Sequence, residues 1–212
     1  MDSFFQKIAN KDFDLFFFVE KTMQDKAVRD EIVIQMINNP DIMVYYHCFY
    51  VLEEAISRQP ELFYPYWTEI SNLLEHPNSY HRDFALTLLA GLISADSVKR
   101  FDEIKDKYLS LLNDQKFMTA LCCLRGLGQI VSSKPDLLPG VMTLLMQHQN
   151  ATVYQPRQEA LFNADVLLLI QQNYLTKTIP PALLAFIEKQ QTSQSPKTQR
   201  MAKAFFKELS KP

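Results

Sequence analysis

The segment Asp83-Phe84-Ala85-Leu86-Thr87-Leu88-Leu89-Ala90-Gly91-Leu92, followed by Ile93, decides the fold of this chain. Ala85, Leu89 and Ile93 stand four residues apart, and residues at that spacing share one face of an α-helix. The same apolar face recurs along the chain. Its last position is occupied, at spacings of 37, 37, 38, 39 and 39 residues, by Val19, Ile56, Ile93, Val131, Ile170 and Leu209.

The neighbouring positions of this repeat column are alike between the copies as well. Four residues earlier, every copy is apolar: Leu15, Leu52, Leu89, Leu127, Val166 and Phe205. Eight residues earlier, five of six copies are apolar: Lys11, Cys48, Ala85, Cys123, Phe162 and Met201. A fixed period of this length indicates a stack of structural repeats.

Helical periodicity between the prolines predicts one helical hairpin per repeat. We expect the first helices near residues 12–22, 43–58, 80–94, 116–132, 156–172 and 197–210. We expect the second helices near residues 26–38, 64–75, 101–113, 140–149 and 181–190. Two such short helices cannot bury both faces alone, so consecutive pairs should stack. The predicted fold class is all-α, a right-handed α-solenoid (superhelix) of about five to six hairpins of 37–39 residues.

The solenoid is expected to form a single domain over residues 1–212. Its repeats are placed at 1–39, 40–77, 78–114, 115–152 and 153–192, with a C-terminal capping helix at 196–212. The period, the proline-marked turns and the segment 83–92 resemble HEAT or armadillo-type repeats over nearly the whole chain. This resemblance implies a fold but no one function, because such repeats serve as scaffolds, transport factors, lyase-like proteins and DNA glycosylases.

Glycine is scarce in this chain, with four residues where average usage of ~7% would give roughly 15. Neither G-x-x-x-x-G-K-[ST] nor G-x-G-x-x-G occurs, which excludes the common nucleotide-binding loops. Gly91, Gly126 and Gly128 fall inside expected first helices, where a missing side chain lets neighbouring helices approach. Gly140 is expected to mark a turn.

The net charge is -2, but it is unevenly distributed. Residues 1–106 hold 18 acidic and 10 basic side chains, a balance of -8, whereas residues 107–212 hold 6 and 12, a balance of +6. The start of the chain lacks a basic n-region, and the most apolar run, residues 16–19, is far shorter than the ~20 residues that span a bilayer. Three cysteines make no disulfide framework. We therefore expect a soluble cytoplasmic protein without a membrane partner.

Catalytic and metal-binding patterns are missing from the sequence. Cys48 and Cys123 share the repeat position of Ala85, which favours packing over chemistry. Glu53 and Glu54 are adjacent, so they point to different faces of a helix and are best explained as solvated surface. The histidines lack the spacing of a helical metal site: His47, His76, His81 and His148. We expect no cofactor and no metal, and a non-enzymatic protein rather than an enzyme.

Aromatic residues gather between positions 45 and 67, which hold eight of the chain's 25. They could form packing between repeats, or a recognition patch, because Tyr and Trp combine apolar area with a polar group. The candidate partner-binding residues are Tyr46, Tyr64 and Trp67. If the inner helices line a concave surface, Tyr64 and Trp67 should project from one of them, one turn apart.

The last expected helix is strongly amphipathic, with Met201, Phe205 and Leu209 on its apolar face. Its other face is uniformly basic and is the candidate anion-binding stripe: Lys197, Arg200, Lys203, Lys207 and Lys211. Three interpretations stay open for this face. It could be a solubilising cap, a site for phosphate backbones or an acidic protein, or a head-to-tail contact with a second copy.

The N-terminal segment carries Phe4, Phe5, Phe13 and the run 16–18. A first repeat lacks a neighbour on one side, so this aromatic face could mediate docking or homo-oligomerisation, or the first residues could fold back as a cap.

Two function classes lead. The first is a scaffold or adaptor that binds a protein or peptide partner through its concave helical surface. The alternative is nucleic-acid binding, similar to the HEAT-type alkylpurine DNA glycosylases, which use a basic groove with tryptophans and an aspartate. A third class, similar to HEAT-like bilin lyases, has no supporting residue set.

Overall fold

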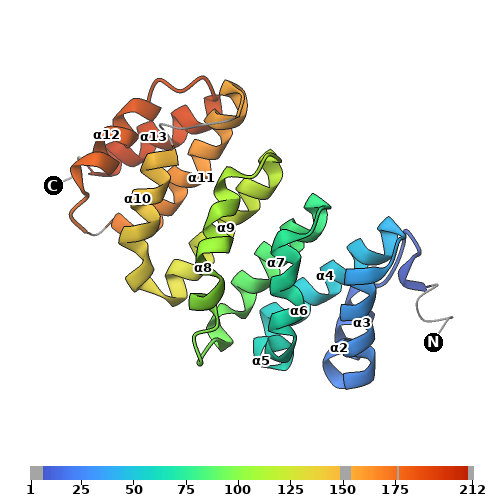
Figure 1. Cartoon of the computed structure of the whole chain (residues 1–212). Helices are drawn as coiled ribbons and strands as arrows, with labels where there is room; N and C mark the ends of the chain where they lie inside the picture. The colour runs from blue at the N-terminus through green and yellow to red at the C-terminus, as the bar shows by residue number, and fades with distance from the viewer. Residues whose placement is uncertain (1–6, 149–153, 176, 210–212) are drawn as a thin grey trace. The chain divides into compact units, whose positions relative to one another are not determined.

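The computed structural model describes residues 7–148, 154–175 and 177–209 of the chain. Within these ranges every regular element is helical and none is a strand, which confirms the all-α prediction (Figure 1). The chain divides into two compact units, Met1–Leu109 and Ser110–Pro212. The placement of all repeats in a single domain stays a prediction.

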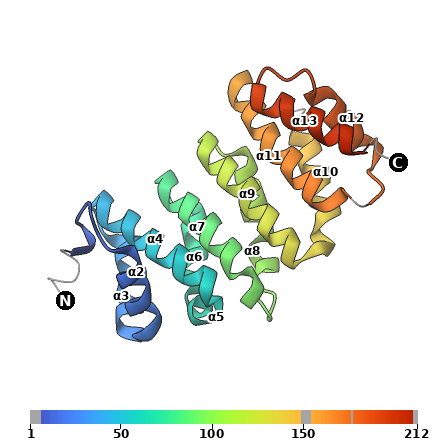
Figure 2. The same cartoon turned by 180° about the vertical axis from the view of Figure 1, so that it is seen from behind.

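The first unit contains helices that pack as neighbours in the order expected of a repeat. Its elements are α2 (Leu15–Gln24), α3 (Lys26–Asn38), α4 (Ile42–Arg58), α5 (Pro60–Phe63), η1 (Tyr64–Tyr66), α6 (Trp67–Asn72), η2 (Leu73–Glu75), α7 (Ser79–Leu92), η3 (Ile93–Ala95) and, ending just past the unit boundary, α8 (Phe101–Ser110). Helix α4 lies between α2 and α7, and α3 and α6 pack against α4 and α7 respectively (Figures 1 and 2).

The second unit repeats this arrangement. Its elements are η4 (Leu111–Asn113), α9 (Phe117–Ser133), η5 (Pro135–Leu137), α10 (Leu138–His148), α11 (Pro156–Tyr174), α12 (Pro181–Gln190) and α13 (Pro196–Leu209). Helix α11 packs against α9 on one side and α13 on the other, and α10 packs against α12. Figure 2 shows α9, α11 and α13 side by side.

The helix boundaries follow from capping chemistry. The side chains of Asp14, Asp25 and Asp41 accept hydrogen bonds from backbone amides of the first turns of α2, α3 and α4. Among the described residues, four prolines occupy the first residue of an α-helix, where no amide donor is needed: Pro60, Pro156, Pro181 and Pro196.

The second helix expected at 64–75 is helical throughout but irregular, because η1, α6 and η2 follow one another across this range. Pro65, which has no amide hydrogen to donate to the carbonyl four residues earlier, lies in η1. One local prediction was wrong. Gly140 does not mark a turn but lies in the first turn of α10.

The repeat column forms the core of both units. Val19, Ile56 and Ile93 in the first unit are at most 4% exposed, and so are Val131 and Ile170 in the second. The apolar period in the sequence is therefore the period with which first helices bury one face. At one crossing the fit requires glycine, because a Cβ on Gly91 would lie 2.8 Å from Ile56 Cγ2.

Candidate protein-binding surfaces

Three tyrosines from two neighbouring helices form an exposed aromatic surface on the first unit, here called the tyrosine patch (Tyr46, Tyr50 and Tyr80). Tyr46 and Tyr50 are one turn apart on α4, with ring centroids 6.0 Å apart, and Tyr80 of α7 lies 5.3 Å from Tyr46. Tyr50 is 42% exposed and Tyr80 is 41% exposed, whereas Tyr46 is half-buried between them. The patch thus exposes two rings beside a third that is half-buried.

The patch rests on a packed aromatic base. Phe49 and Phe84 stack with centroids 4.2 Å apart, and Tyr46 meets Phe84 edge to face at 5.2 Å. Because this base is buried and aromatic pairs resist rearrangement, the exposed rings are held in place before any partner arrives.

Acidic side chains border the tyrosine patch. Burial, the neighbouring tyrosines and Asp83 raise the pKa of Tyr46 to about 12, so its hydroxyl stays neutral at physiological pH. Glu53, one turn beyond Tyr50 on α4, has its pKa raised by burial and by Glu54. The surface is consequently aromatic with an acidic border.

Histidines lie beside the buried aromatic rings beneath the patch, and among the described residues they do not form part of a metal-ligand set. His81 is buried, and its ring stacks on His76 at 4.2 Å. Burial and the proximity of His76 lower the pKa of His81. Within the described ranges, no three side chains of His, Cys, Asp or Glu converge to a geometry that could hold a metal ion.

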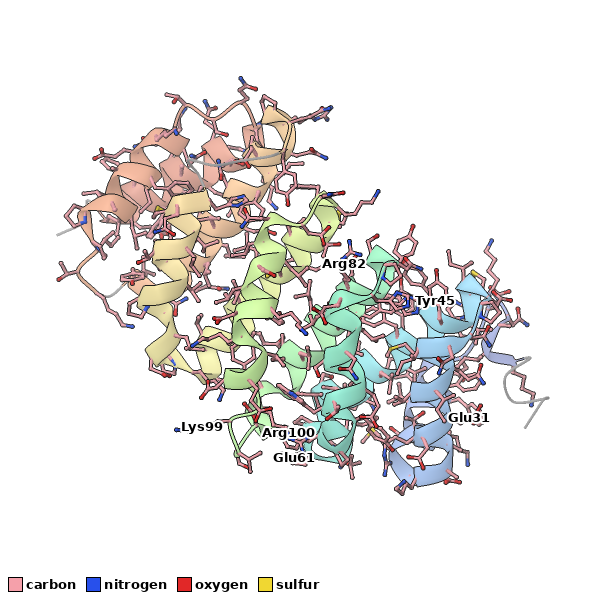
Figure 3. All side chains as sticks on the ribbon, viewed as in Figure 1. Glu31, Tyr45, Glu61, Arg82, Lys99 and Arg100 are labelled. Carbon is pink, nitrogen blue, oxygen red and sulfur yellow. The ribbon has the colours of Figure 1, made fainter. Side chains whose placement is uncertain are left out.

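Tyr64 and Trp67 lie elsewhere and face inward. The expectation that Trp67 projects from its helix was wrong, because its side chain is only 2% exposed. The half-buried Tyr64 donates a 2.7 Å hydrogen bond to Asp96, and the guanidinium of Arg100 lies 5.2 Å from its ring. In Figure 3, Arg100 lies at the opposite edge of the first unit from Tyr45, which adjoins Tyr46.

The contacts of Tyr64 give it a structural task. Asp96 is buried and accepts hydrogen bonds from the backbone amides of Arg100 and Phe101, where α8 begins. The Tyr64 hydroxyl supports this capping carboxylate, and burial together with Asp96 raises the pKa of Tyr64 to about 12. The residue type of Tyr64 suggested a role in partner recognition, whereas its hydrogen bond indicates a role in stabilising the start of α8.

The basic face predicted on the last helix is present on α13. Ala202 and Phe205 are buried, and Arg200, Lys203 and Lys207 are exposed and form no ion pair within the described ranges. Lys197 lies 3.9 Å from Asp165, and Lys211 lies outside the described residues. The amphipathic pattern is confirmed, and anion binding stays a prediction.

The N-terminal aromatic face is described from Phe13 onward. Phe16 and Phe17 are 61% and 44% exposed, while Phe13 stacks on His47 at 3.8 Å. Phe4 and Phe5 lie outside the described residues. Association of copies through this face stays a prediction.

Comparison of the chain with known protein families, curated proteins and solved structures gives no match. In the part of the chain that the structure describes, no helix combines the length and apolarity needed to cross a bilayer. The resemblance to HEAT or armadillo-type repeats therefore stays a prediction, which rests on the internal period and is compatible with the helical packing.

Proposed function

We propose that this chain is a non-enzymatic protein-binding scaffold whose helical hairpins form a HEAT-like right-handed α-solenoid. The buried repeat column supports this architecture, because it recurs every 37 residues in the first unit and every 39 residues in the second. The tyrosine patch carries the proposal of protein binding. Rigid, exposed tyrosines offer a large contact area at low entropic cost, and they are frequent among the residues that dominate binding energy.

The chemistry of the patch favours a basic partner segment. The first unit holds 18 acidic and 11 basic side chains, and Glu53 and Asp83 adjoin the tyrosines. An arginine over a tyrosine ring gains cation–π attraction, and a neighbouring carboxylate adds charge complementarity. The partner in this proposal is a peptide segment that carries Arg or Lys beside apolar residues.

Affinity capture with crosslinking from a native lysate tests the proposal. The variant Tyr50→Ala/Tyr80→Ala should lose the captured partner, with an affinity at least about 30-fold weaker, because two hot-spot rings are removed. Val98→Ala is the control, since it truncates an exposed apolar side chain that lies outside both the patch and the N-terminal aromatic face. Equal capture by the double variant and the wild type would eliminate the tyrosine patch as the binding site.

Nucleic-acid binding is the second candidate, supported by the exposed cations of α13. Its glycosylase-like form has less support, because Trp67, the only tryptophan, is buried and does not reach a base. Duplex DNA binding that weakens steeply with salt, and that is lost in Lys203→Glu/Lys207→Glu, would favour this candidate.

A further inference from the structure

A groove of about 690 Å³ runs between α9 and α11 of the second unit, well away from the residues of the tyrosine patch in sequence. Its volume is in the range of protein sites that bind ligands. The lining covers residues 124–132 of α9 and 165–173 of α11, or roughly 12 Å of helix. An extended chain advances ~3.3 Å per residue, so the groove accommodates about four residues of a peptide.

Gly128 keeps the floor of this groove open. A Cβ at this position would lie 3.6 Å from Leu169 Cδ1, which is an ordinary van der Waals contact. The packing of α9 on α11 therefore does not require a glycine here, unlike the tight crossing at Gly91. What the missing side chain provides is space within the groove.

The groove presents the hydrogen-bonding groups that an extended backbone needs. Gln129 of α9 and Gln172 of α11 are both exposed and line the groove from opposite sides. Their amides form no hydrogen bond with another described residue, and each offers a donor and an acceptor. A peptide backbone alternates N–H and C=O groups, so paired amides can bind it irrespective of its sequence. Leu168, 42% exposed, adds an apolar contact at the rim.

An oriented arginine supplies the specificity. Arg125 Nε donates a 2.7 Å hydrogen bond to Asp165 Oδ2, and this contact fixes the guanidinium plane. The carboxylate engages only the Nε side, and the two Nη groups of this exposed side chain remain available for another bond within the described structure. A guanidinium with a free pair of N–H donors suits bidentate binding of a carboxylate.

The surroundings reinforce this preference for negative charge. Lys197 Nζ lies 3.9 Å from Asp165 Oδ1, so two cations share this single carboxylate. The second unit holds 11 basic and 6 acidic side chains. Several of the basic side chains are the exposed cations of α13, which packs against α11. Such a field attracts acidic segments and raises their rate of association.

We propose that the groove between α9 and α11 binds an extended segment of another protein through its backbone, with an Asp or Glu side chain on Arg125. The inference rests on the proposed function of protein binding, but it uses the second unit and none of the tyrosine-patch residues. The amides hold the backbone, the glycine leaves room for it, and the arginine selects an acidic side chain.

Selection from a random 12-residue peptide library on the immobilised full-length chain tests this proposal. The enriched peptides should carry Asp or Glu. A synthetic copy of the leading peptide should bind Gly128→Ala as tightly as the wild type and bind Gly128→Met and Arg125→Gln at least about 10-fold more weakly. Arg157→Gln is the matched charge control, since it removes one exposed cation of the second unit that lies outside the groove and outside α13, and it should change the affinity less than about threefold. Thermal melting of each variant establishes that the chain is folded.

Three results would overturn the proposal that the groove binds an acidic peptide segment. These are no enrichment of acidic peptides, equal binding by Gly128→Met and the wild type, and displacement of the peptide by duplex DNA at physiological salt. The failure of this inference differs from that of the proposed function. Loss of a captured partner in Tyr50→Ala/Tyr80→Ala, together with unchanged peptide binding by Gly128→Met, would retain the tyrosine patch and reject the groove.

Discussion

Replacement of two glycines by alanine gives a matched pair of substitutions in first helices. Gly91 lies near the end of α7, where an added Cβ would be 2.8 Å from Ile56 Cγ2, far inside van der Waals contact. Gly128 lies within α9, where the added Cβ would be 3.6 Å from its nearest neighbour, Leu169. The two substitutions are chemically identical, so the difference between them isolates the steric term.

The expected signs are opposite. Alanine in place of a helical glycine stabilises by about 0.8–1 kcal/mol, and Gly128→Ala should show most of this gain. At Gly91 the new methyl meets a β-branched side chain that is 2% exposed and cannot rotate away, and such overpacking costs about 1–3 kcal/mol. Gly91→Ala should therefore be less stable than Gly128→Ala by about 1–3 kcal/mol.

Denaturant unfolding followed by circular dichroism measures this difference, and melting temperature provides a second readout at about 2–4 °C per kcal/mol. In an Ile56→Ala background, which removes the obstructing methyl, Gly91→Ala should become neutral or stabilising, with a coupling energy of about 1–3 kcal/mol. Equal stability of Gly91→Ala and Gly128→Ala, or the same effect of Gly91→Ala in both backgrounds, would refute a steric clash between Gly91 and Ile56.

Three more predictions concern polar and thiol side chains. Tyr64→Phe removes a hydrogen bond to the buried carboxylate of Asp96 and should destabilise the chain by about 1–2 kcal/mol in denaturant unfolding. An unchanged free energy of unfolding would contradict a stabilising role of this bond. Burial lowers the pKa of His81 and His148 below the usual 6.5, so the unfolded chain binds protons that the folded chain does not. The free energy of unfolding should therefore fall as the pH drops from about 7.5 toward 5. A denaturation midpoint that is independent of pH would contradict this prediction. Cys122 is the one cysteine with solvent contact, and maleimide labelling read by mass spectrometry should modify it first, while the two buried thiols react only on unfolding.

Much of the fold could be predicted from the sequence, because one physical requirement repeats. The copies of this face on α4, α7 with η3, α9 and α11 each bury three residues spaced by four, and the period of that face indicates where the helices lie. The break at Pro65 was harder to foresee, since a proline in the first turn of a helix and one that divides a helix look alike in sequence. Because α5 already begins at Pro60, Pro65 lies beyond the first helical turn and therefore interrupts the helix.

The candidate site was less predictable, since residue type does not determine exposure. Trp67 and Tyr50 belong to the same aromatic-rich stretch of sequence, residues 45–67, yet the side chain of Trp67 is 2% exposed and that of Tyr50 is 42% exposed. A signal for Tyr50 was present in the four-residue spacing from Tyr46, which places both on one helical face. No sequence pattern indicated Tyr80, which joins the patch from the next helix only because α7 packs on α4.

The groove between α9 and α11 shows why charge has to be considered together with geometry. The excess of basic residues in the C-terminal half includes the exposed Lys203 and Lys207 of α13, which have no ion-pair partner within the described ranges. Arg125 carries the same charge, but Asp165 fixes its guanidinium, and Gly128 leaves space beside it. Since an ordered donor loses less entropy on binding than a free lysine does, a single oriented arginine in a groove is the stronger source of specificity. The first unit has a charge balance of -7 and the second a balance of +5, so the two proposed surfaces would favour segments of opposite charge: a basic one at the tyrosine patch and an acidic one in the groove.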